Sequence, residues 1–225
     1  MIGIQPRELL IATSNPGKVK EIQASLSGLP LRLRMLDEYP DIVRPDETGA
    51  SYVENAVIKA QSYSNQTGLC ALADDSGLEV ATLEGAPGLK SARFGEPEIS
   101  DSERCRLLLF KLSQAPDRDR RARFICMMVI SDPSLGVINI AEGKCEGSIA
   151  EIEAGRSGFG FDPVFVPEGY QLTFAQLPLE VKNRISHRAK ALSTTREFLK
   201  QSLNPSASLT AGLAGSLECI SFLIN

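Results

Sequence analysis

The sequence has few of the residues that build disulfide-linked or zinc-binding domains, and it has no long apolar run. Its five cysteines are odd in number and widely spaced without a Cys-x-x-Cys pair, and its single histidine is His187. This pattern excludes a Cys/His zinc site and predicts reduced thiols of the kind found in cytosolic proteins. No segment is long enough to cross a bilayer, and no basic start precedes an apolar stretch. We therefore expect a cytoplasmic protein with no membrane partner.

An excess of positive charge is also absent. With 24 Lys and Arg against 28 Asp and Glu, the formal net charge is −4 and the isoelectric point is near 5.2. The phosphates of DNA or RNA require a basic protein face, so this balance argues against a nucleic-acid polymer as a partner. The length of 225 residues and the hydrophobic content of 43% instead fit a globular enzyme with a proper core.

Strand-like apolar runs alternate with helical patterns along the chain, which predicts an α/β fold. A turn-rich link at 132–136 is typical of an antiparallel hairpin, so we expect a mixed sheet. The expected strands are 8–13, 31–36, 70–73, 124–131, 137–142 and 164–166, and the expected helices are 16–27, 52–66, 101–113 and 187–201.

Two adjacent carboxylates, Asp74 and Asp75, follow an apolar run and precede Ser76 and Gly77. Burial of two like charges costs several kcal/mol unless a cation or hydrogen bonds offset it. Mg²⁺ is a hard cation that takes one or two carboxylates together with substrate phosphates. The alternative is a strand that ends in a solvated Asp turn closed by Ser76 and Gly77. The pair alone leaves both interpretations open.

A second segment, Thr13-Ser14-Asn15-Pro16-Gly17-Lys18, lies between an apolar strand and a helical pattern. Pro16 suits a first helical turn and Ser14 or Asn15 suits the N-cap, so backbone N–H groups and Lys18 converge where an anion is favoured. An ordinary capped helix start with an exposed lysine would have the same sequence.

A third segment, around Glu54, opens another predicted helix. Ser51 and Glu54 have the spacing of a capping box, yet a first-turn carboxylate could equally give Mg²⁺ a further oxygen ligand. Asn55 and Lys59 are at positions i and i+4 and share one helix face. Solvated side chains would give the same pattern.

Glycines and aromatic residues alternate in Gly158-Phe159-Gly160-Phe161-Asp162-Pro163, and Lys182, His187 and Arg188 follow. Glycine lets the backbone approach a flat ring, and an aromatic face stacks on any nucleobase. The later side chains donate hydrogen bonds that suit phosphate or carbonyl oxygens. A core Phe pair in a turn, with a basic helix start capped by Ser186, is the alternative.

Together these segments resemble the inosine/xanthosine triphosphate pyrophosphatase family, which removes deaminated purine nucleotides. The resemblance extends from about Leu9 to Leu199 and departs from the family at Phe161, Gln176 and Ala154, where Tyr, Glu and Arg are common. Further segments that carry it are Gly85-Ala86-Pro87-Gly88, Ser91-Ala92-Arg93-Phe94 and Lys182-Asn183-Arg184-Ile185-Ser186-His187-Arg188.

The resemblance implies Mg²⁺-dependent hydrolysis of ITP, dITP or XTP to the monophosphate and pyrophosphate by a homodimer. It implies a long mixed sheet with flanking helices, and two lobes with the active-site cleft between them, in a single domain over residues 1–203; residues 204–225 form a tail of unknown role. The implied catalytic residue is Asp75, the implied metal ligands are Glu54, Asp74 and Asp75, and the implied substrate-binding residues are Thr13, Ser14, Asn15, Pro16, Gly17, Lys18, Lys59, Ser76, Phe159, Gly160, Phe161, Asp162, Lys182, His187 and Arg188.

Two other functions are open at this point. A related pyrophosphatase could act on pyrimidine or methylated nucleotides, and a nucleotide-sensing module could bind without hydrolysis. The aromatic segment at 158–163 with His187 and Arg188 argues against the first, and the three carboxylates argue against the second. A donor such as Arg188 favours the 6-carbonyl of hypoxanthine or xanthine and rejects the amino group of adenine.

Overall fold

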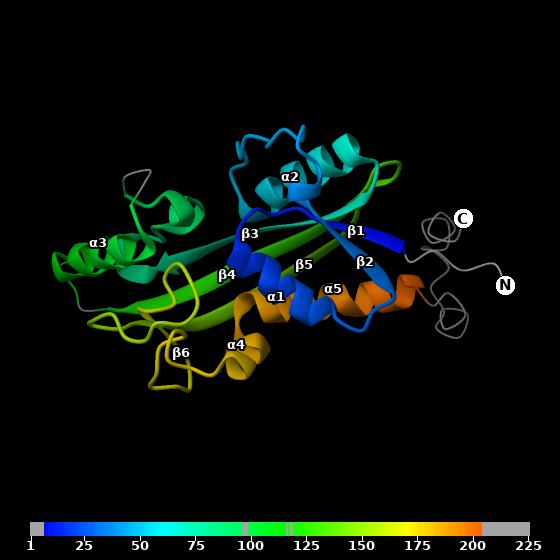
Figure 1. Ribbon diagram of the computed structural model, residues 1–225. Helices are drawn as coiled ribbons and strands as arrows, with labels where there is room; N and C mark the ends of the chain where they lie inside the picture. Colours follow the sequence, from blue (N-terminus) through cyan, green and yellow to red (C-terminus); the bar gives the residue numbers. More distant parts are fainter. Residues whose placement is uncertain (1–6, 96–98, 116, 118, 204–225) are drawn as a thin grey trace, which may run out of the picture. The chain divides into compact units, whose positions relative to one another are not determined.

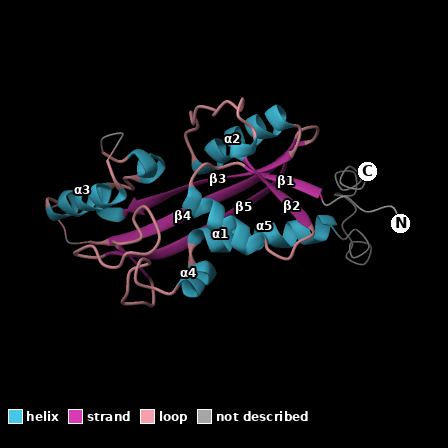
Figure 2. Ribbon diagram, in the orientation of Figure 1, coloured by secondary structure: helices cyan, strands magenta, loops and turns pink. Residues whose placement is uncertain are grey.

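The computed structural model of the chain describes residues 7–95, 99–115, 117 and 119–203 (Figure 1). In this part of the chain a six-stranded sheet has flanking helices, as Figure 2 shows. The strands are β1 (Arg7–Ile11), β2 (Leu31–Met35), β3 (Cys70–Val80), β4 (Arg121–Asp132), β5 (Gly136–Ile149) and β6 (Phe165–Pro167), and the α-helices are α1 (Pro16–Leu26), α2 (Tyr52–Thr67), α3 (Asp101–Ser113), α4 (Leu179–Ile185) and α5 (His187–Leu203).

The strand order in the sheet is β2-β1-β3-β4-β5-β6. β1 pairs in parallel with β2 and with β3, whereas β5 and β6 pair antiparallel. The predicted mixed α/β sheet is therefore confirmed. The turn between β4 and β5 is held by Asp132, whose Oδ1 accepts hydrogen bonds from Ser134 N at 2.8 Å and Leu135 N at 2.9 Å. This link is the one that the sequence indicated at 132–136.

Strand β3 is longer than the sequence predicted. The expected strand 70–73 ended before Asp74, whereas β3 continues to Val80. It lies between β1 and β4 in the sheet, and its residues are buried almost without a break, as expected of a central strand covered on both faces. Asp74 and Asp75 therefore lie inside the strand, and the interpretation of this pair as a solvated turn at a strand end is wrong.

Contacts divide the chain into two compact units, which are described separately. Of the described residues, the first unit contains 7–74, 127–141 and 191–203. Its helices α1 and α5 are tied by Arg196, whose Nη1 donates to Ser25 O at 2.9 Å and to Ser27 O at 3.1 Å. One cluster of its core consists of Leu10, Ala12, Ala56, Ala60, Tyr63, Ala71, Ala73 and Val129.

The second unit contains 75–126 and 142–190, less the undescribed positions. Phe124 lies at the centre of its aromatic contacts, with ring centroids 4.7 Å from Phe165 and 4.5 Å from His187. Its core consists of Leu78, Val80, Cys105, Leu108, Leu112, Ala122, Phe124, Cys145, Ile149, Phe161, Val164, Phe165, Phe174 and Leu177. The single domain over 1–203 stays a prediction, and the predicted tail 204–225 lies outside the described residues.

The four cysteines in the described part of the chain, Cys70, Cys105, Cys126 and Cys145, carry free thiols. Burial raises the pKa of Cys70 and of Cys105 to about 12 and that of Cys145 to about 11. The thiols of Cys70, Cys105 and Cys145 therefore stay protonated at neutral pH and pack as small apolar groups. Among the described helices, none combines the length and the apolar character needed to cross a bilayer.

Candidate active site

The segment that precedes α1 forms a capped helix start. Asn15 is the N-cap, and its Oδ1 accepts hydrogen bonds from Gly17 N at 2.9 Å and Lys18 N at 3.1 Å. Pro16 occupies the first helical position, where its missing N–H costs nothing. Of the two cap residues that the sequence allowed, Asn15 rather than Ser14 has this role. The positive end of the helix dipole remains at this point and favours an anion.

Lys18 and Asp74 form an ion pair, with Lys18 Nζ 2.9 Å from Asp74 Oδ2. The Asp74 side chain is fully buried and the Lys18 side chain is 17% exposed, so the description of Lys18 as an exposed lysine is wrong. Register explains the pair: β1 and β3 run in parallel with Ile11 opposite Leu72, which brings the chain after Ile11 beside Asp74. The sequence led us to expect a cation beside the buried carboxylates. At Asp74 this cation is Lys18, which belongs to the candidate phosphate-binding segment.

Asp75 is the second carboxylate of β3 and is 7% exposed. Successive residues of a strand face opposite sides of a sheet, so we assign Asp75 to the face opposite Asp74. Short carboxylate side chains on opposite faces of one strand do not reach a common ion. The alternation therefore separates the two carboxylates: Asp74 pairs with Lys18 on one face, and Asp75 lies on the other.

Glu54 lies in the first turn of α2 and is exposed. Its Oε2 accepts from Ala50 N at 2.9 Å and its Oε1 accepts from the Ser51 hydroxyl at 3.0 Å, while Glu54 N donates back to Ser51 Oγ. Ser51 therefore caps the helix, but Glu54 accepts from Ala50 N instead of Ser51 N, so the predicted capping box is only half formed. The hydrogen bond from Ala50, followed by the one from Ser51, lowers the pKa of the Glu54 carboxyl, which stays ionised at neutral pH.

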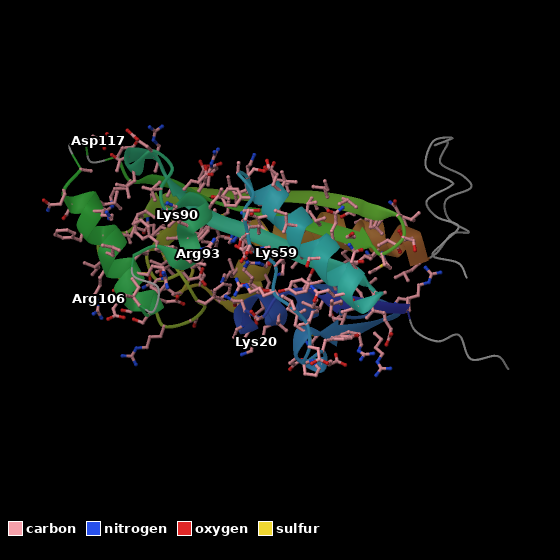
Figure 3. The ribbon with its side chains drawn as sticks, turned by 90° about the horizontal axis from the view of Figure 1, so that it is seen from above. Lys20, Lys59, Lys90, Arg93, Arg106 and Asp117 are labelled. Carbon is pink, nitrogen blue, oxygen red and sulfur yellow. The ribbon has the colours of Figure 1, made fainter. Side chains whose placement is uncertain are left out.

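Lys59, five residues after Glu54 in α2, is 9% exposed and is labelled in Figure 3. Its Nζ lies 3.6 Å from Oε1 of Glu47, a residue of the loop before α2 whose side chain is 13% exposed. Sequence reasoning missed Glu47, because an acidic residue in a loop rich in Pro, Asp, Thr and Gly looks solvated. The nearest sequence signal was the spacing of Ser51 and Glu54, which indicates a helix start and gives no reason to bury Glu47. Its partly buried position depends on the tertiary contact with Lys59.

In the described part of the chain, no group of three or more His, Cys, Asp or Glu side chains could hold a metal ion. The hard carboxylate oxygens that Mg²⁺ prefers are nonetheless present at Asp75, Asp74 and Glu54. Of these, Asp74 binds Lys18 and Glu54 closes its own helix start. All three side chains offer the kind of oxygen donor that suits a divalent cation.

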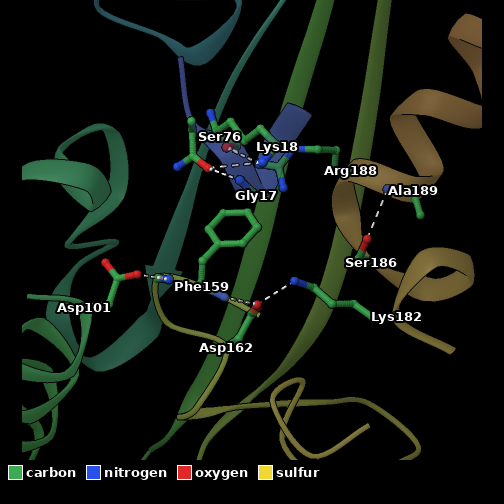
Figure 4. A network of polar contacts seen from close by, with 12 residues as sticks. Gly17, Lys18, Ser76, Asp101, Phe159, Asp162, Lys182, Ser186, Arg188 and Ala189 are labelled. Atoms are coloured by element: carbon green, nitrogen blue, oxygen red, sulfur yellow. Dashed lines mark hydrogen bonds and ion pairs between the residues drawn. The ribbon is translucent and has the colours of Figure 1, made fainter. Parts of the chain in front are cut away.

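A buried ion pair anchors the aromatic loop at 158–162. Asp162 Oδ2 accepts from Lys182 Nζ at 2.5 Å and from Phe159 N at 2.9 Å, and both charged side chains are at most 5% exposed (Figure 4). Gly158 precedes the loop with φ of 80°, and a Cβ at this position would lie 2.0 Å from Asp162 Oδ2. Glycine is required at Gly158 because of both its backbone conformation and the closeness of this carboxylate.

The two phenylalanines of this loop have different surroundings. Phe161 is 3% exposed and belongs to the core, which fits the core interpretation for this residue. Phe159 is half-buried, with Lys182 Nζ 4.8 Å and the Arg188 guanidinium carbon 5.6 Å from its ring centroid. A half-buried aromatic ring with two cations over it is a suitable surface for a flat, carbonyl-bearing base.

The start of α5 contributes the remaining residues. Ser186 Oγ accepts from Ala189 N at 3.1 Å, which confirms the predicted cap. His187 is 4% exposed and stacks on Phe124 with 9° between the ring planes. Arg188 is 2% exposed, and its Nη2 donates to Ser76 Oγ at 2.9 Å. Ser76 and Arg188 are thus in contact, although they are 112 residues apart in the sequence.

Comparisons with known proteins show what this chain is similar to in sequence and in fold. The sequence model of the Ham1 family matches residues 9–198. The dITP/XTP pyrophosphatase of Desulforamulus reducens is 44% identical over 195 residues, or 86% of this chain and 96% of the relative. That of Deinococcus radiodurans is 44% identical over 189 residues, or 84% and 91%. A solved HAM1 protein from Coxiella burnetii is 38% identical, with a TM-score of 0.80 over 87% of this chain and 99% of that one.

Proposed function

Since the chain belongs to the Ham1 family, we propose that it hydrolyses the deaminated purine nucleotides ITP, dITP and XTP to the monophosphate and pyrophosphate. The curated relatives named dITP/XTP pyrophosphatases align with most of this chain, and the sequence model of the family matches residues 9–198, which contain the segments of the candidate active site. In this proposal the enzyme removes non-standard purines from the nucleotide pool. The observation that carries the proposal is the buried carboxylate pair inside β3, with Lys18 of the α1 start bound to its first member.

The triphosphate is proposed to contact the residues around the start of α1. Lys18 and the positive end of the α1 dipole favour the phosphates, and Thr13 to Gly17 supply hydroxyl and backbone groups. Lys59, which is held beside Glu47, is proposed as a further phosphate contact. These groups orient the phosphates, which matters because phosphoryl transfer depends mostly on positioning and electrostatics.

Asp75 is proposed as the proton acceptor for the water that attacks the α-phosphate. Its side chain is almost fully buried. A carboxylate in such a position is an effective general base when bound substrate keeps bulk water away from it. We propose Mg²⁺ as the cofactor, held by one or two carboxylates of the set Asp75, Asp74 and Glu54. Bound Mg²⁺ would neutralise the negative charge that develops on the leaving pyrophosphate.

The purine base is proposed to stack on Phe159, near the Lys182 and Arg188 cations that lie over the ring. A guanidinium donor near the base favours a carbonyl at position 6, whereas the amino group of adenine would leave two donors facing each other. Gly160, Phe161, Asp162 and His187 support this surface through the loop and the aromatic core rather than by exposed side chains. A homodimer in the cytoplasm is proposed for the whole protein on the basis of the family.

A panel of nucleoside triphosphates tests this function. We expect ITP, dITP and XTP to be hydrolysed with kcat/KM about a hundredfold above that of ATP, since each mismatched buried group costs about 1–3 kcal/mol. Pyrophosphate and orthophosphate are assayed separately, with Mg²⁺ and with EDTA. Release of orthophosphate alone contradicts cleavage between the α- and β-phosphates, best turnover of a pyrimidine triphosphate favours the related enzyme, and saturable binding without turnover favours a sensing module.

Arg188→Ala tests how the base is selected. We expect the ratio of kcat/KM for ITP to that for ATP to fall about tenfold, because a carbonyl-directed donor is lost. Arg184→Ala is the matched control, since Arg184 is exposed on the neighbouring helix α4 and should leave the ratio unchanged. An unchanged ratio in the Arg188 variant would place base selection elsewhere.

A further inference from the structure

Helix α3 holds both backbone polar groups of Gly160. Gly160 N donates a hydrogen bond to Asp101 Oδ2 at 2.6 Å, and the Cys105 thiol donates to Gly160 O at 3.4 Å. Asp101 and Cys105 are four residues apart in α3, so they lie on one face of the helix. Figure 4 shows the Asp101 side chain directed at the loop that carries Phe159. A single peptide of the aromatic loop is thus held from two sides by a helix that the proposed reaction does not otherwise use.

The chemistry of the two side chains suits these contacts, with Cys105 as the donor and Asp101 as the acceptor. Cys105 is fully buried and has a raised pKa of about 12, so its sulfur keeps the proton that it donates to Gly160 O. Asp101 lies in the first turn of α3, where the helix dipole favours a carboxylate. The start of α3 is itself fixed by a capping box, in which Ser100 N donates to Glu103 Oε2 at 2.8 Å and Glu103 N donates to Ser100 Oγ.

The position of Gly160 makes this contact relevant to Phe159. Gly160 has φ of 59°, a conformation that favours glycine, and it directly follows Phe159. On the other side of the same short loop, Asp162 accepts from Phe159 N at 2.9 Å. The backbone is therefore held by Asp162 before the ring and by α3 after it, and the direction of the half-buried ring depends on both.

We propose that Asp101 and Cys105 are positioning residues that fix the Phe159 ring in the orientation in which it receives the base. This inference rests on the proposed function for the role of the ring, but the mechanical claim about the loop stands independently. Neither side chain is proposed to touch the substrate. Loss of Asp101 should therefore weaken nucleotide binding while the chemical step, which depends on Asp75, keeps its rate.

The first test measures the loop in the free protein. The chain contains no tryptophan, so Phe159→Trp introduces a single fluorescent reporter at the ring. We expect Asp101→Ala in this background to raise the rate of acrylamide quenching about twofold and to lower the anisotropy, whereas Asp101→Asn, which keeps an acceptor oxygen, stays close to the parent. Glu103→Ala is the control, because it removes the capping box of the same helix without touching Gly160.

The second test measures ITP hydrolysis by variants that retain Phe159. We expect Asp101→Ala to raise KM about tenfold and Cys105→Ala to raise it about threefold, with kcat within about twofold of the parent, and Asp101→Asn to restore most of the Asp101 effect. If Glu103→Ala changes KM as much as Asp101→Ala does, the effect comes from the stability of α3 and the inference is overturned. Unchanged quenching in Asp101→Ala would also overturn it. If the parent protein hydrolyses no nucleotide, the proposed function fails, while the tryptophan measurement still decides whether α3 holds the loop.

Discussion

Replacement of Asp75 by asparagine is expected to lower kcat for ITP about a thousandfold, because general-base catalysis contributes roughly 10²–10⁴-fold. Asparagine has nearly the same shape and keeps a carbonyl oxygen, but it neither accepts a proton nor carries the negative charge that a divalent cation needs. Single-turnover release of pyrophosphate measures the chemical step, and calorimetric titration with ITP measures binding. We expect the dissociation constant to change by less than about tenfold, since Lys18 and the base-stacking ring are intact.

Glu79→Gln is the matched control for Asp75→Asn. Glu79 lies four residues further along β3 and forms an ion pair with Arg123 at 2.8 Å on the partly exposed part of the strand. The same change from carboxylate to amide there should leave kcat within about twofold of the parent, because an exposed pair contributes little. A near-normal rate in Asp75→Asn, or an equal loss in Glu79→Gln, would remove Asp75 from the role of proton acceptor.

Local sequence signals predicted the elements whose ends are set by local chemistry. The helix expected at 101–113 is α3, with the same bounds, because the capping box of Ser100 and Glu103 fixes its start. The start of α1 was predicted at Pro16 for the same kind of reason, and α5 was predicted to begin at His187. Short-range signals failed at α4, a seven-residue helix that follows Pro178 without a side-chain cap.

The length of β3 could not be predicted from local chemistry. Ser76 and Gly77 favour a turn, but the strand lies between β1 and β4 and gains ladder hydrogen bonds that a turn would lose. Tertiary pairing thus overrides turn propensity at the point where the two candidate catalytic carboxylates occur. The result strengthens the functional interpretation, because Asp74 and Asp75 are buried, at 2% and 7% exposure, rather than solvated.

Motif spacing located the candidate residues but not their partners. The sequence indicated that Lys18 and Asp74 both belong to the site, yet their ion pair depends on the register of β1 against β3. The contact of Glu47 with Lys59 and that of Asp101 with Gly160 also join segments whose proximity only the folded chain defines. A carboxylate in a loop or a first helical turn has too many local uses for its sequence context to indicate a distant partner.

Removal of the Lys182 ammonium is expected to lower the free energy of unfolding by about 3–5 kcal/mol, because it leaves the buried carboxylate of Asp162 without its cation. Lys182→Met keeps most of the side-chain volume, so the loss reports charge rather than packing. Urea unfolding followed by circular dichroism measures the change. We expect the double variant Lys182→Met with Asp162→Asn to recover most of the loss, since the amide oxygen can still accept from Phe159 N without a buried charge.

Lys200→Met is the control for this experiment. Lys200 forms an ion pair with Glu197 at 2.6 Å, but the two side chains are 43% and 58% exposed. Breaking such a surface pair should change the free energy of unfolding by less than about 1 kcal/mol. The two losses should differ because of burial. When Lys200 is replaced, water can solvate the carboxylate that remains, whereas the buried carboxylate of Asp162 has no access to water when Lys182 is replaced. Equal losses in Lys182→Met and Lys200→Met, or a double variant no more stable than Lys182→Met, would show that the Lys182–Asp162 pair does not anchor the aromatic loop by charge.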